Sequence, residues 1–345
     1  MTVISPGVPL SALPEKPSVY TSEIELAYSE LPYGSKVLEI TGTNGKSTVT
    51  HLAAQILNNA GLKAVACGNI GYPFADAVLD EKADVYVLEL SSFQLELIQG
   101  GDFELNAAVL TNLTPDHLDR YASFEEYAAA KLAITGFIDS EGVFISDPDT
   151  YVVNKVLRAP YKVKYVDKEL KAWPKLEGKK LEFDGFYVNT DAFKLFGWHN
   201  LLNLSFAIGL ASAVLDLEGD VTRLIKGLTG MPHRTETVLV KDGITWINDS
   251  KATNVDSTLI ALRSCTFPTI VLLGGYDKKG DFTLLVDELN RVASMVICFG
   301  GAADIIYKQL EGKLMFLLVK AAKLRDAVEA AHKEANVDGT TVPLS

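Results

Sequence analysis

The sequence predicts an α/β protein with two sheets: a mostly parallel central sheet, and a second sheet in a C-terminal, Rossmann-like doubly wound domain. Short apolar runs alternate with helical patterns from residue 35 onward, and the same alternation restarts after residues 231–236. Strands that alternate with helices form largely parallel sheets covered by helices. The length of 345 residues is that of about two domains.

The composition is that of a folded protein without a basic surface. Hydrophobic residues make up 48% of the chain and charged residues 22%, which is enough to form extended cores. The formal charge of -12, with no lysine or arginine stripe, argues against nucleic acid as a partner. A polyanionic ligand would therefore be bound at a local site.

The cysteines and the hydropathy indicate in which cellular compartment the protein resides. Cys67, Cys265 and Cys298 lie far apart in apolar runs, which favours buried, reduced thiols over disulfides or a metal cluster. Residues 1–17 are rich in proline, and no apolar stretch reaches membrane-spanning length. We therefore expect a cytoplasmic protein without a membrane partner.

The elements of the central domain follow from the local patterns. Residues 1–34 are too few for a domain and hold one helical pattern, at 22–31. Asp184-Gly185 between alternating residues predicts a hairpin over 179–188, and Ser123 with Glu126 forms a capping box. Apolar runs predict strands at 36–41, 63–67, 85–90, 107–113, 143–146 and 162–166, and helical spacing predicts helices that end at 59 or span 123–136, 201–214 and 221–228.

A second series of elements follows residues 231–236, which we interpret as a hinge. The expected strands are 244–247, 269–273, 295–299, 315–319 and 340–345, and the expected helices are 256–263, 284–293, 302–310 and 324–335. This alternation is typical of a doubly wound sheet. We therefore expect an N-terminal segment at 1–34, a central domain at 35–234 and a C-terminal domain at 235–345.

The run from Val37 to Val49 organises the chain, because it places a glycine-bracketed turn between an apolar strand and a helix. Backbone N–H groups of this turn and of the helix N-terminus would point into one concavity that binds phosphate oxygens. Lys46 would lie against the β- and γ-phosphates, and the Ser47 hydroxyl would bind Mg2+. The central domain would then be a P-loop-type ATPase domain.

The spacing of this motif departs from the usual P-loop. It reads Gly-x-x-Gly-Lys-Ser, two residues shorter than the usual pattern, because Ile40 stands where that pattern has its first glycine. An ordinary strand-to-helix turn, with glycines at positive φ, is the alternative. The strand-turn-helix context favours the phosphate site.

Seven further stretches of the chain form an ordered set of motifs: Gly68–Gly71, Leu88–Glu96, Asn112–Tyr121, Ala130–Leu132, His199-Asn200 with Asn203, Met231–Glu236, and Ile247–Asn254. In this order they closely resemble the Mur ligases of peptidoglycan synthesis. The resemblance covers nearly the whole chain from Ser5 onward, and the second and seventh stretches are most similar to the members that add D-glutamate.

Metal binding rests partly on the residues and partly on this resemblance. Glu89 ends a strand expected beside the phosphate loop, where a carboxylate can hold Mg2+; a strand-end acid without such a role is the alternative. Taken alone, His117 would be a surface or packed residue and Lys131 a lysine extending from an apolar helix face. The resemblance instead implies two Mg2+ ions held by Ser47, Glu89, His117 and a carbamylated Lys131.

The resemblance also implies the other site residues. Arg234, whose guanidinium can hold a phosphoryl group with two hydrogen bonds, joins Lys46, Glu89, His117 and Lys131 as catalytic. Turn or cap chemistry is the alternative for the asparagines, and Lys279 is a second candidate for the role of Lys278. The ATP-binding residues would be Gly42, Thr43, Asn44, Gly45, Lys46, Ser47, Thr48, Asn200, Asn203, Arg234 and Asp249, and the substrate residues Asn69, Ser91, His233, Lys251, Thr253 and Lys278.

The activity implied is an ATP-dependent amide ligation. ATP would phosphorylate the carboxylate of UDP-N-acetylmuramoyl-L-alanine, and the amine of D-glutamate would attack the acyl phosphate. The family analogy favours a monomer whose partners are these small molecules. Two alternatives stay open: another amide ligase of the superfamily, such as a folylpolyglutamate synthase, or an ATP-binding core without full ligase activity.

The alternative of an ATP-binding core arises because the resemblance stops short at both ends of the chain. Residues 1–34 match only the last part of an N-terminal UDP-binding domain and its linker. Leu344-Ser345 stands where the family continues into a loop that holds D-glutamate. From this pattern we expect ATP and Mg2+ binding to be retained, with substrate binding reduced.

Overall fold

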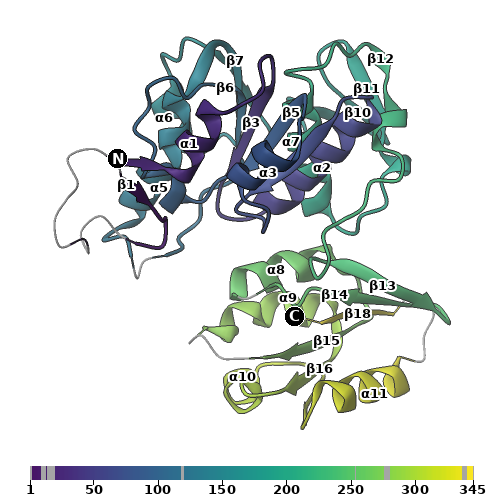
Figure 1. Ribbon diagram of the computed structural model, residues 1–345. Coiled ribbons are helices and arrows are strands. Elements are labelled where there is room, and N and C mark those ends of the chain that lie inside the picture. Colours follow the sequence, from purple (N-terminus) through teal and green to yellow (C-terminus); the bar gives the residue numbers. More distant parts are fainter. Residues whose placement is uncertain are drawn as a thin grey trace. The chain divides into compact units, whose positions relative to one another are not determined.

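The computed structural model describes residues 2–8, 13, 20–117, 120–252, 254–275, 280–335 and 340–344. The chain divides into two compact units, each with its own sheet and helices (Figure 1). The first unit comprises Met1–Lys194 and Leu202–Thr229, and the second comprises Leu195–Leu201 and Gly230–Ser345. The segments 195–201 and 230–234, which we expected in the central domain, thus belong to the second unit.

The first unit is organised around a six-stranded sheet in which every neighbouring pair is parallel, in the order β4-β5-β3-β6-β7-β8. The register pairs Ile40 with Glu89 on one side of β3 and Thr41 with Leu110 on the other. The carboxyl ends of β5, β3 and β6 therefore lie side by side. The strands are β3 (Lys36–Thr41), β4 (Ala64–Gly68), β5 (Val85–Glu89), β6 (Leu105–Leu110), β7 (Ile138–Ser146) and β8 (Lys162–Tyr165).

Helices cover both faces of this sheet, which confirms the predicted α/β class. One face packs a continuous apolar cluster against α1, α3, α4, α5 and α6, whereas α2 packs on the other face. The N-terminal segment adds a parallel pair, β1 (Thr2–Ile4) and β2 (Tyr20–Ser22), that the sequence did not predict. The helices are α1 (Glu23–Ser29), α2 (Lys46–Asn59), α3 (Phe74–Asp80), α4 (Ser92–Leu95), α5 (Phe124–Leu132), α6 (Thr150–Val156) and α7 (Trp198–Ala211).

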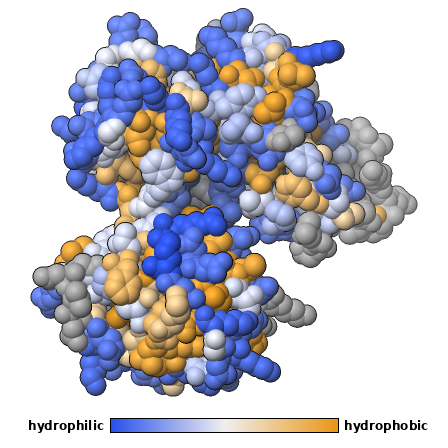
Figure 2. Space-filling view, turned by 180° about the vertical axis from the view of Figure 1, so that it is seen from behind, coloured by the Kyte–Doolittle hydropathy of each residue, from blue (hydrophilic) through white to orange (hydrophobic). Residues whose placement is uncertain are grey.

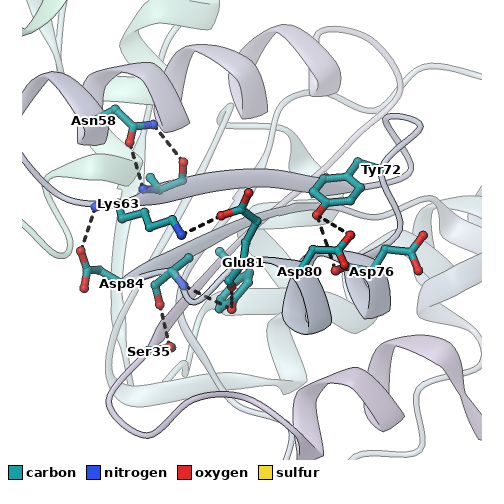
Figure 3. Close-up of polar contacts among 11 residues, drawn as sticks. Ser35, Asn58, Lys63, Tyr72, Asp76, Asp80, Glu81 and Asp84 are labelled. Atoms are coloured by element: carbon teal, nitrogen blue, oxygen red, sulfur yellow. Dashed lines mark hydrogen bonds and ion pairs between the residues drawn. The ribbon is translucent and has the colours of Figure 1, made fainter.

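Side-chain hydrogen bonds and an ion pair join the amino ends of β4 and β5, at the edge of the sheet opposite the predicted phosphate-loop turn (Figure 3). The Asn58 amide donates to the Ala64 carbonyl oxygen at 2.9 Å and accepts from the Ala64 N–H at 3.1 Å. The Asp84 carboxylate accepts from the Lys63 N–H at 2.8 Å, and the Lys63 ammonium lies 2.6 Å from Glu81. These bonds join the end of α2 to the starts of β4 and β5.

Two local predictions in this unit need correction. The helix predicted at 221–228 is wrong: the chain forms strand β12 (Gly219–Asp220) and a 3-10 turn, Thr222–Ile225. The Asp220 carboxylate accepts the Thr222 N–H at 2.9 Å, which starts the tight turn. Ser123 does cap α5, but the Glu126 carboxylate accepts from the N–H of Ala122 instead of Ser123, so the capping box is incomplete.

The predicted hairpin over 179–188 is confirmed. Strands β10 (Lys180–Glu182) and β11 (Phe186–Asn189) pair antiparallel around the Asp184-Gly185 turn, and Gly185 has φ 85°. They form a four-stranded sheet with β9 (Lys175–Glu177) and β12, in the order β12-β11-β10-β9.

A carboxyl group without a partner lies in the core of the first unit. Glu39 is 0% exposed, and neither of its carboxyl oxygens has a hydrogen-bond partner among the described residues. It lies on the same face of β3 as Val37, which packs in the apolar cluster against α5. Burial raises the pKa of Glu39 well above its usual value of 4.5, against the weaker opposing effect of the Lys131 charge. Glu39 is therefore held as a neutral acid.

Replacing Glu39 by leucine is expected to stabilise the protein. Above its usual pKa of 4.5 the carboxyl ionises in the unfolded chain but not in the core, so native stability falls as the pH rises. The variant should unfold at a higher urea concentration, and its free energy of unfolding should be about 2 kcal/mol larger at about pH 8. Its stability should also fall less steeply as the pH rises. Glu104→Leu, at an exposed position of the same unit, is the control. A less stable Glu39→Leu protein would contradict the prediction.

The second unit has a six-stranded sheet in the order β13-β14-β18-β15-β16-β17, parallel except for the β13–β14 pair. The predicted helix at 284–293 is shorter, because 282–285 form a 3-10 turn and Ala293 already starts β16. The elements are β13 (Glu236–Lys241), β14 (Ile244–Asn248), α8 (Val255–Ser264), β15 (Thr269–Gly274), α9 (Val286–Val292), β16 (Ala293–Phe299), α10 (Ala303–Leu310), β17 (Leu317–Ala321), α11 (Leu324–Glu334) and β18 (Thr341–Leu344).

Apolar patches interrupt the polar surface in the view of Figure 2. On the second unit, the outer strand β13 exposes Val238, Leu239 and Val240. A groove of about 520 Å³ beside them is lined by β13, β14, β18 and α11, and the Trp246 and His332 rings lie 6.2 Å apart there.

All three cysteines lie in the interior. Cys67, Cys265 and Cys298 are buried and free, as predicted. Within the described ranges, no helix has both the length and the apolar character needed to span a membrane.

Candidate functional site

The turn after β3 has the backbone that the sequence predicts for a phosphate loop. Gly42 and Gly45 have φ 137° and 87°, in the region that favours glycine. A Cβ on Gly42 would lie 2.0 Å from the Thr111 hydroxyl oxygen, and one on Gly45 2.5 Å from the Asn203 side-chain oxygen. Glycine is therefore required at both positions by close approach as well as by backbone conformation.

Residues that follow β6 hold this loop, and the sequence analysis gave them no role. The Asn112 side chain accepts from the Asn44 N–H at 3.0 Å and donates to the Asn44 carbonyl oxygen at 2.9 Å. The Thr111 hydroxyl donates to the same carbonyl oxygen at 2.6 Å, and the Thr43 N–H donates to the Asn112 carbonyl oxygen at 2.9 Å. Strand β6 ends before Thr111 and Asn112, which bind the loop, and so it ends three residues earlier than the predicted 113.

Helix α2 opens toward the loop with its first turn uncapped. Gly45 precedes Lys46 and supplies no side-chain cap, so the first N–H groups of the helix can meet an anion. The Lys46 ammonium donates to the Thr43 carbonyl oxygen at 2.9 Å, back across the loop. Ser47 is half-buried and Thr48 is buried in this first turn. These residues place backbone and side-chain donors at one end of the first unit, an arrangement that could accept an anion.

Tyr127 connects the loop to α5, and the sequence analysis did not single it out. Its hydroxyl lies 3.0 Å from the Thr43 hydroxyl, and its ring lies 4.8 Å from the Lys131 ammonium. Burial raises the pKa of Tyr127 to about 12, so the phenol stays protonated. The spacing of four residues on one helix face was the available signal, because it stacks Tyr127 beside Lys131.

Glu89 lies at the end of β5 with half of its carboxylate unsatisfied. It is 2% exposed, and one oxygen accepts from the Asn69 amide at 3.1 Å. Oε2 is buried without a hydrogen-bond partner in the described part of the chain. A buried carboxylate oxygen of this kind fits a bound cation, which would replace the water it has lost.

Lys131 is buried near Lys46, and this environment disfavours its charge. It is 2% exposed. Burial lowers the pKa of Lys131 to about 7, and the Lys46 charge adds to the effect, whereas Asp116, Glu89 and Glu39 oppose it. A large share of the amine is therefore neutral near pH 7, and the neutral amine is the nucleophilic form.

His117 is placed by a strained backbone and an aromatic neighbour. Its φ is 53°, and its ring meets the Phe93 ring edge-on at 5.1 Å. The Arg120 guanidinium also stacks over the Phe93 ring, with its central carbon 3.9 Å from the ring centroid. No group of three His, Cys, Asp or Glu side chains that could hold a metal occurs in the residues described. A metal at Glu89 would need further ligands of another kind.

Ser91 has a structural role at the start of α4. Its hydroxyl accepts from the Gln94 N–H at 3.3 Å, and the Ser91 N–H donates to the Gln94 side-chain oxygen at 3.0 Å. This is a complete capping box. The predicted substrate contact of Ser91 would add to this role.

The second unit brings four predicted residues together around the end of β14. Thr235, with φ 44°, donates its N–H to the Asp249 Oδ1 at 2.8 Å, and the Lys251 N–H donates to the His233 carbonyl oxygen at 3.1 Å. Burial raises the pKa of Asp249 to about 6, although the Thr235 hydrogen bonds and then the Arg234 charge act in the opposite direction.

Three predicted residues remain. Asn200, in the second unit, donates to the Phe196 carbonyl oxygen at 2.7 Å. Thr253 and Lys278, together with the alternative Lys279, lie outside the described residues.

Two family models match this chain, one over its central part and one over its C-terminal part. The Mur ligase middle domain matches residues 40–211, and the glutamate ligase domain of Mur ligases matches residues 233–344. The UDP-N-acetylmuramoylalanine–D-glutamate ligase of Cytophaga hutchinsonii is 35% identical over 364 aligned positions, covering 100% of this chain and 79% of that protein. The ligase of the same name from Bacteroides fragilis is 36% identical and covers 99% and 79%.

Solved structures share the fold at low sequence identity. MurF ligase from Thermotoga maritima, in complex with ADP, superposes with a TM-score of 0.68 at 19% identity, over 93% of this chain and 79% of that one. Folylpolyglutamate synthase from Mycobacterium tuberculosis, complexed with ADP and AMPPCP, gives 0.68 at 17% identity, over 93% and 90%.

Proposed function

This chain belongs to the Mur ligase family, and we propose that it adds D-glutamate to UDP-N-acetylmuramoyl-L-alanine at the expense of ATP. The carboxylate of the nucleotide sugar attacks the γ-phosphorus of ATP, which releases ADP and leaves an acyl phosphate. The D-glutamate nitrogen then attacks the acyl carbon, loses a proton and expels phosphate, and an amide bond results.

One observation carries this proposal. The uncapped start of α2, with Lys46, lies at the carboxyl edge of the sheet beside β5, whose last residue, Glu89, keeps one buried oxygen unpaired. Phosphoryl transfer needs positioned N–H groups, a lysine and cation ligands at one place. The first unit supplies all three.

Mg2+ fits these residues. Ser47, Glu89 and His117 would hold it, together with Lys131 in a carbamylated form, which would allow two ions. Bound Mg2+ would neutralise phosphate charge as it builds up during transfer. Lys46 would bind the β- and γ-phosphates, with Gly42, Thr43, Asn44, Gly45 and Thr48 around them.

Carbamylation of Lys131 is the step that its environment supports. The neutral amine nitrogen attacks the carbon of CO2, a proton leaves, and the product is a carbamate anion in place of an ammonium. Burial favours the neutral amine, which is the form that reacts, and the nearby Lys46 charge favours the carbamate anion over an ammonium. Two further groups of residues complete the proposal. In the nucleotide site these are Asn200, Asn203, Arg234 and Asp249, and in the substrate site they are Asn69, Ser91, His233, Lys251, Thr253 and Lys278.

Replacing Glu89 by glutamine tests the cation site. The glutamine oxygen can still accept from Asn69, so the local fold should persist, but the amide nitrogen in place of Oε2 cannot bind a cation. The Mg2+ concentration for half-maximal ATP turnover should rise by at least about 10-fold. Glu104→Gln, on an exposed position, is the matched control. An unchanged Mg2+ requirement would remove Glu89 from the site.

The experiment on the whole function measures phosphate release from ATP with Mg2+ and UDP-N-acetylmuramoyl-L-alanine, with and without D-glutamate. A new amide of the expected mass, formed only with D-glutamate, supports the proposal. A product formed only from a folate and L-glutamate would favour the folylpolyglutamate synthase alternative, which shares the fold. Bound ATP without either product would identify an ATP-binding core that lacks full ligase activity.

A further inference from the structure

A chain of hydrogen bonds in the second unit ends on Asp249. The Ser264 hydroxyl lies 3.0 Å from Nδ1 of His199, and Nε2 of the same ring lies 3.3 Å from the Thr235 hydroxyl. The Thr235 hydroxyl lies 3.4 Å from the Asp249 Oδ1, which also accepts the Thr235 N–H at 2.8 Å. Side chains from α8, from the start of α7 and from the segment before β13 thus converge on one carboxylate.

The hydrogen bonds of this network can all be donated in one direction, from Ser264 toward Asp249. Burial lowers the pKa of His199 to about 4, so near pH 7 the ring is neutral and carries one N–H. The Asp249 carboxylate can only accept, so the Thr235 O–H donates to it and the His199 Nε2–H donates to Thr235. Nδ1 then accepts from the Ser264 O–H. His199 and Thr235 thus each donate one hydrogen bond and accept another, which fixes the orientation of the Thr235 hydroxyl.

The backbone is shaped for these contacts. Gly197 has φ 96°, and a Cβ there would lie 2.6 Å from the Ser264 hydroxyl oxygen and 2.7 Å from the His199 ring. A side chain at this position would separate His199 from Ser264. Thr235 has φ 44°, a conformation that a β-branched residue rarely adopts, so neighbouring contacts must stabilise it.

The hydrogen bonds from Thr235 occupy only one oxygen of the Asp249 carboxylate. In the described part of the second unit, every hydrogen bond to the Asp249 side chain ends on Oδ1. Asp249 is 6% exposed, so its rotation is limited by packing as well. With Oδ1 held by Thr235, Oδ2 is the oxygen that can accept from a ligand hydroxyl.

We propose that Ser264, His199 and Thr235 are positioning residues that orient the Asp249 carboxylate, so that Oδ2 accepts from the ribose hydroxyls of ATP. This inference rests on the proposed function, in which Asp249 binds the nucleotide. His199 acts through Thr235, and neither of them contacts the nucleotide through its side chain in this arrangement.

The test compares the affinities of ATP and 2′,3′-dideoxy-ATP, measured with Mg2+ by calorimetry on the full chain. Thr235→Val keeps the shape but removes the hydroxyl, and we expect its ATP dissociation constant to rise by about 10-fold. Thr235→Ser should restore the affinity. The dideoxynucleotide, which lacks the hydroxyls, should bind all variants equally.

Two substitutions of His199 separate its two nitrogens. Glutamine places an amide nitrogen near the Nε2 position, so His199→Gln should retain ATP affinity. Asparagine reaches only the Nδ1 position, so His199→Asn should lose it as Thr235→Val does. His332→Asn, the same substitution at an exposed residue of α11, is the matched control.

The outcomes are distinguishable. Equal losses for ATP and the dideoxynucleotide would reduce the network to a purely structural role and overturn the proposal. Unchanged ATP affinity in Thr235→Val and His199→Asn, while Asp249→Asn weakens ATP alone, would also overturn it and leave the role of Asp249 intact. If Asp249→Asn leaves ATP binding unchanged, the assignment of Asp249 under the proposed function fails, and this inference fails with it.

Discussion

Lys46→Ala is expected to weaken ATP binding by about 100-fold or more, because two charge-assisted hydrogen bonds to phosphate are lost from a site built around them. The Lys46 ammonium already bends back over the loop to the Thr43 carbonyl oxygen, so it is placed before any nucleotide arrives. Titration of the chain with a fluorescent ATP analogue and Mg2+ measures the effect.

Lys36→Ala is the control for this substitution. Lys36 is exposed at the other end of the same strand, so its removal changes net charge equally without touching the loop. If Lys46→Ala binds ATP as tightly as Lys36→Ala does, the loop from Gly42 to Ser47 is not the phosphate site. Circular dichroism of both variants checks that the loss is not one of folding.

Lys131→Met is expected to lower ATP turnover by about 1,000-fold or more, because the variant can form no carbamate and the cation site loses a ligand. Methionine fills a similar volume in the apolar surroundings of α5, so the fold should persist. The chemical step is checked separately, by the carbon NMR signal of a carbamate after addition of 13C-bicarbonate. That signal should be present in the unchanged chain and absent from the variant.

The pH dependence of the carbamate signal follows from the pKa of Lys131. Burial lowers that pKa to about 7, so the amine is neutral above this pH and protonated below it. The carbamate signal should therefore fall as the pH is lowered through about 7. Lys155→Met, at an exposed lysine of α6, should keep the signal. A chain without any carbamate signal would refute the modification, although Glu89 and Lys46 could still bind Mg2+ and ATP.

Local patterns were sufficient for the architecture. The alternation of apolar runs and helical spacing predicted both sheets, because parallel strands buried on two faces must be apolar along their whole length. The run from Gly42 to Ser47 could be interpreted alone, since its glycines and helix start act within six residues. The predicted helix at 221–228 failed because Asp220 caps a tight turn there, and a short side-chain bond outweighs helical spacing.

The sequence by itself determined the fold class, the strand-turn-helix of residues 37–49 and the family, because strand, turn and helix preferences act over a few residues. Only the tertiary structure decided which distant residues hold the site. Asn112 meets Asn44 across 68 positions, and Thr235 meets Asp249 across 14. It also decided which acids and bases are buried, and hence that Glu39 stays neutral and Lys131 loses its charge near pH 7. Burial and long-range hydrogen bonds depend on packing, and packing exists only once the chain has folded.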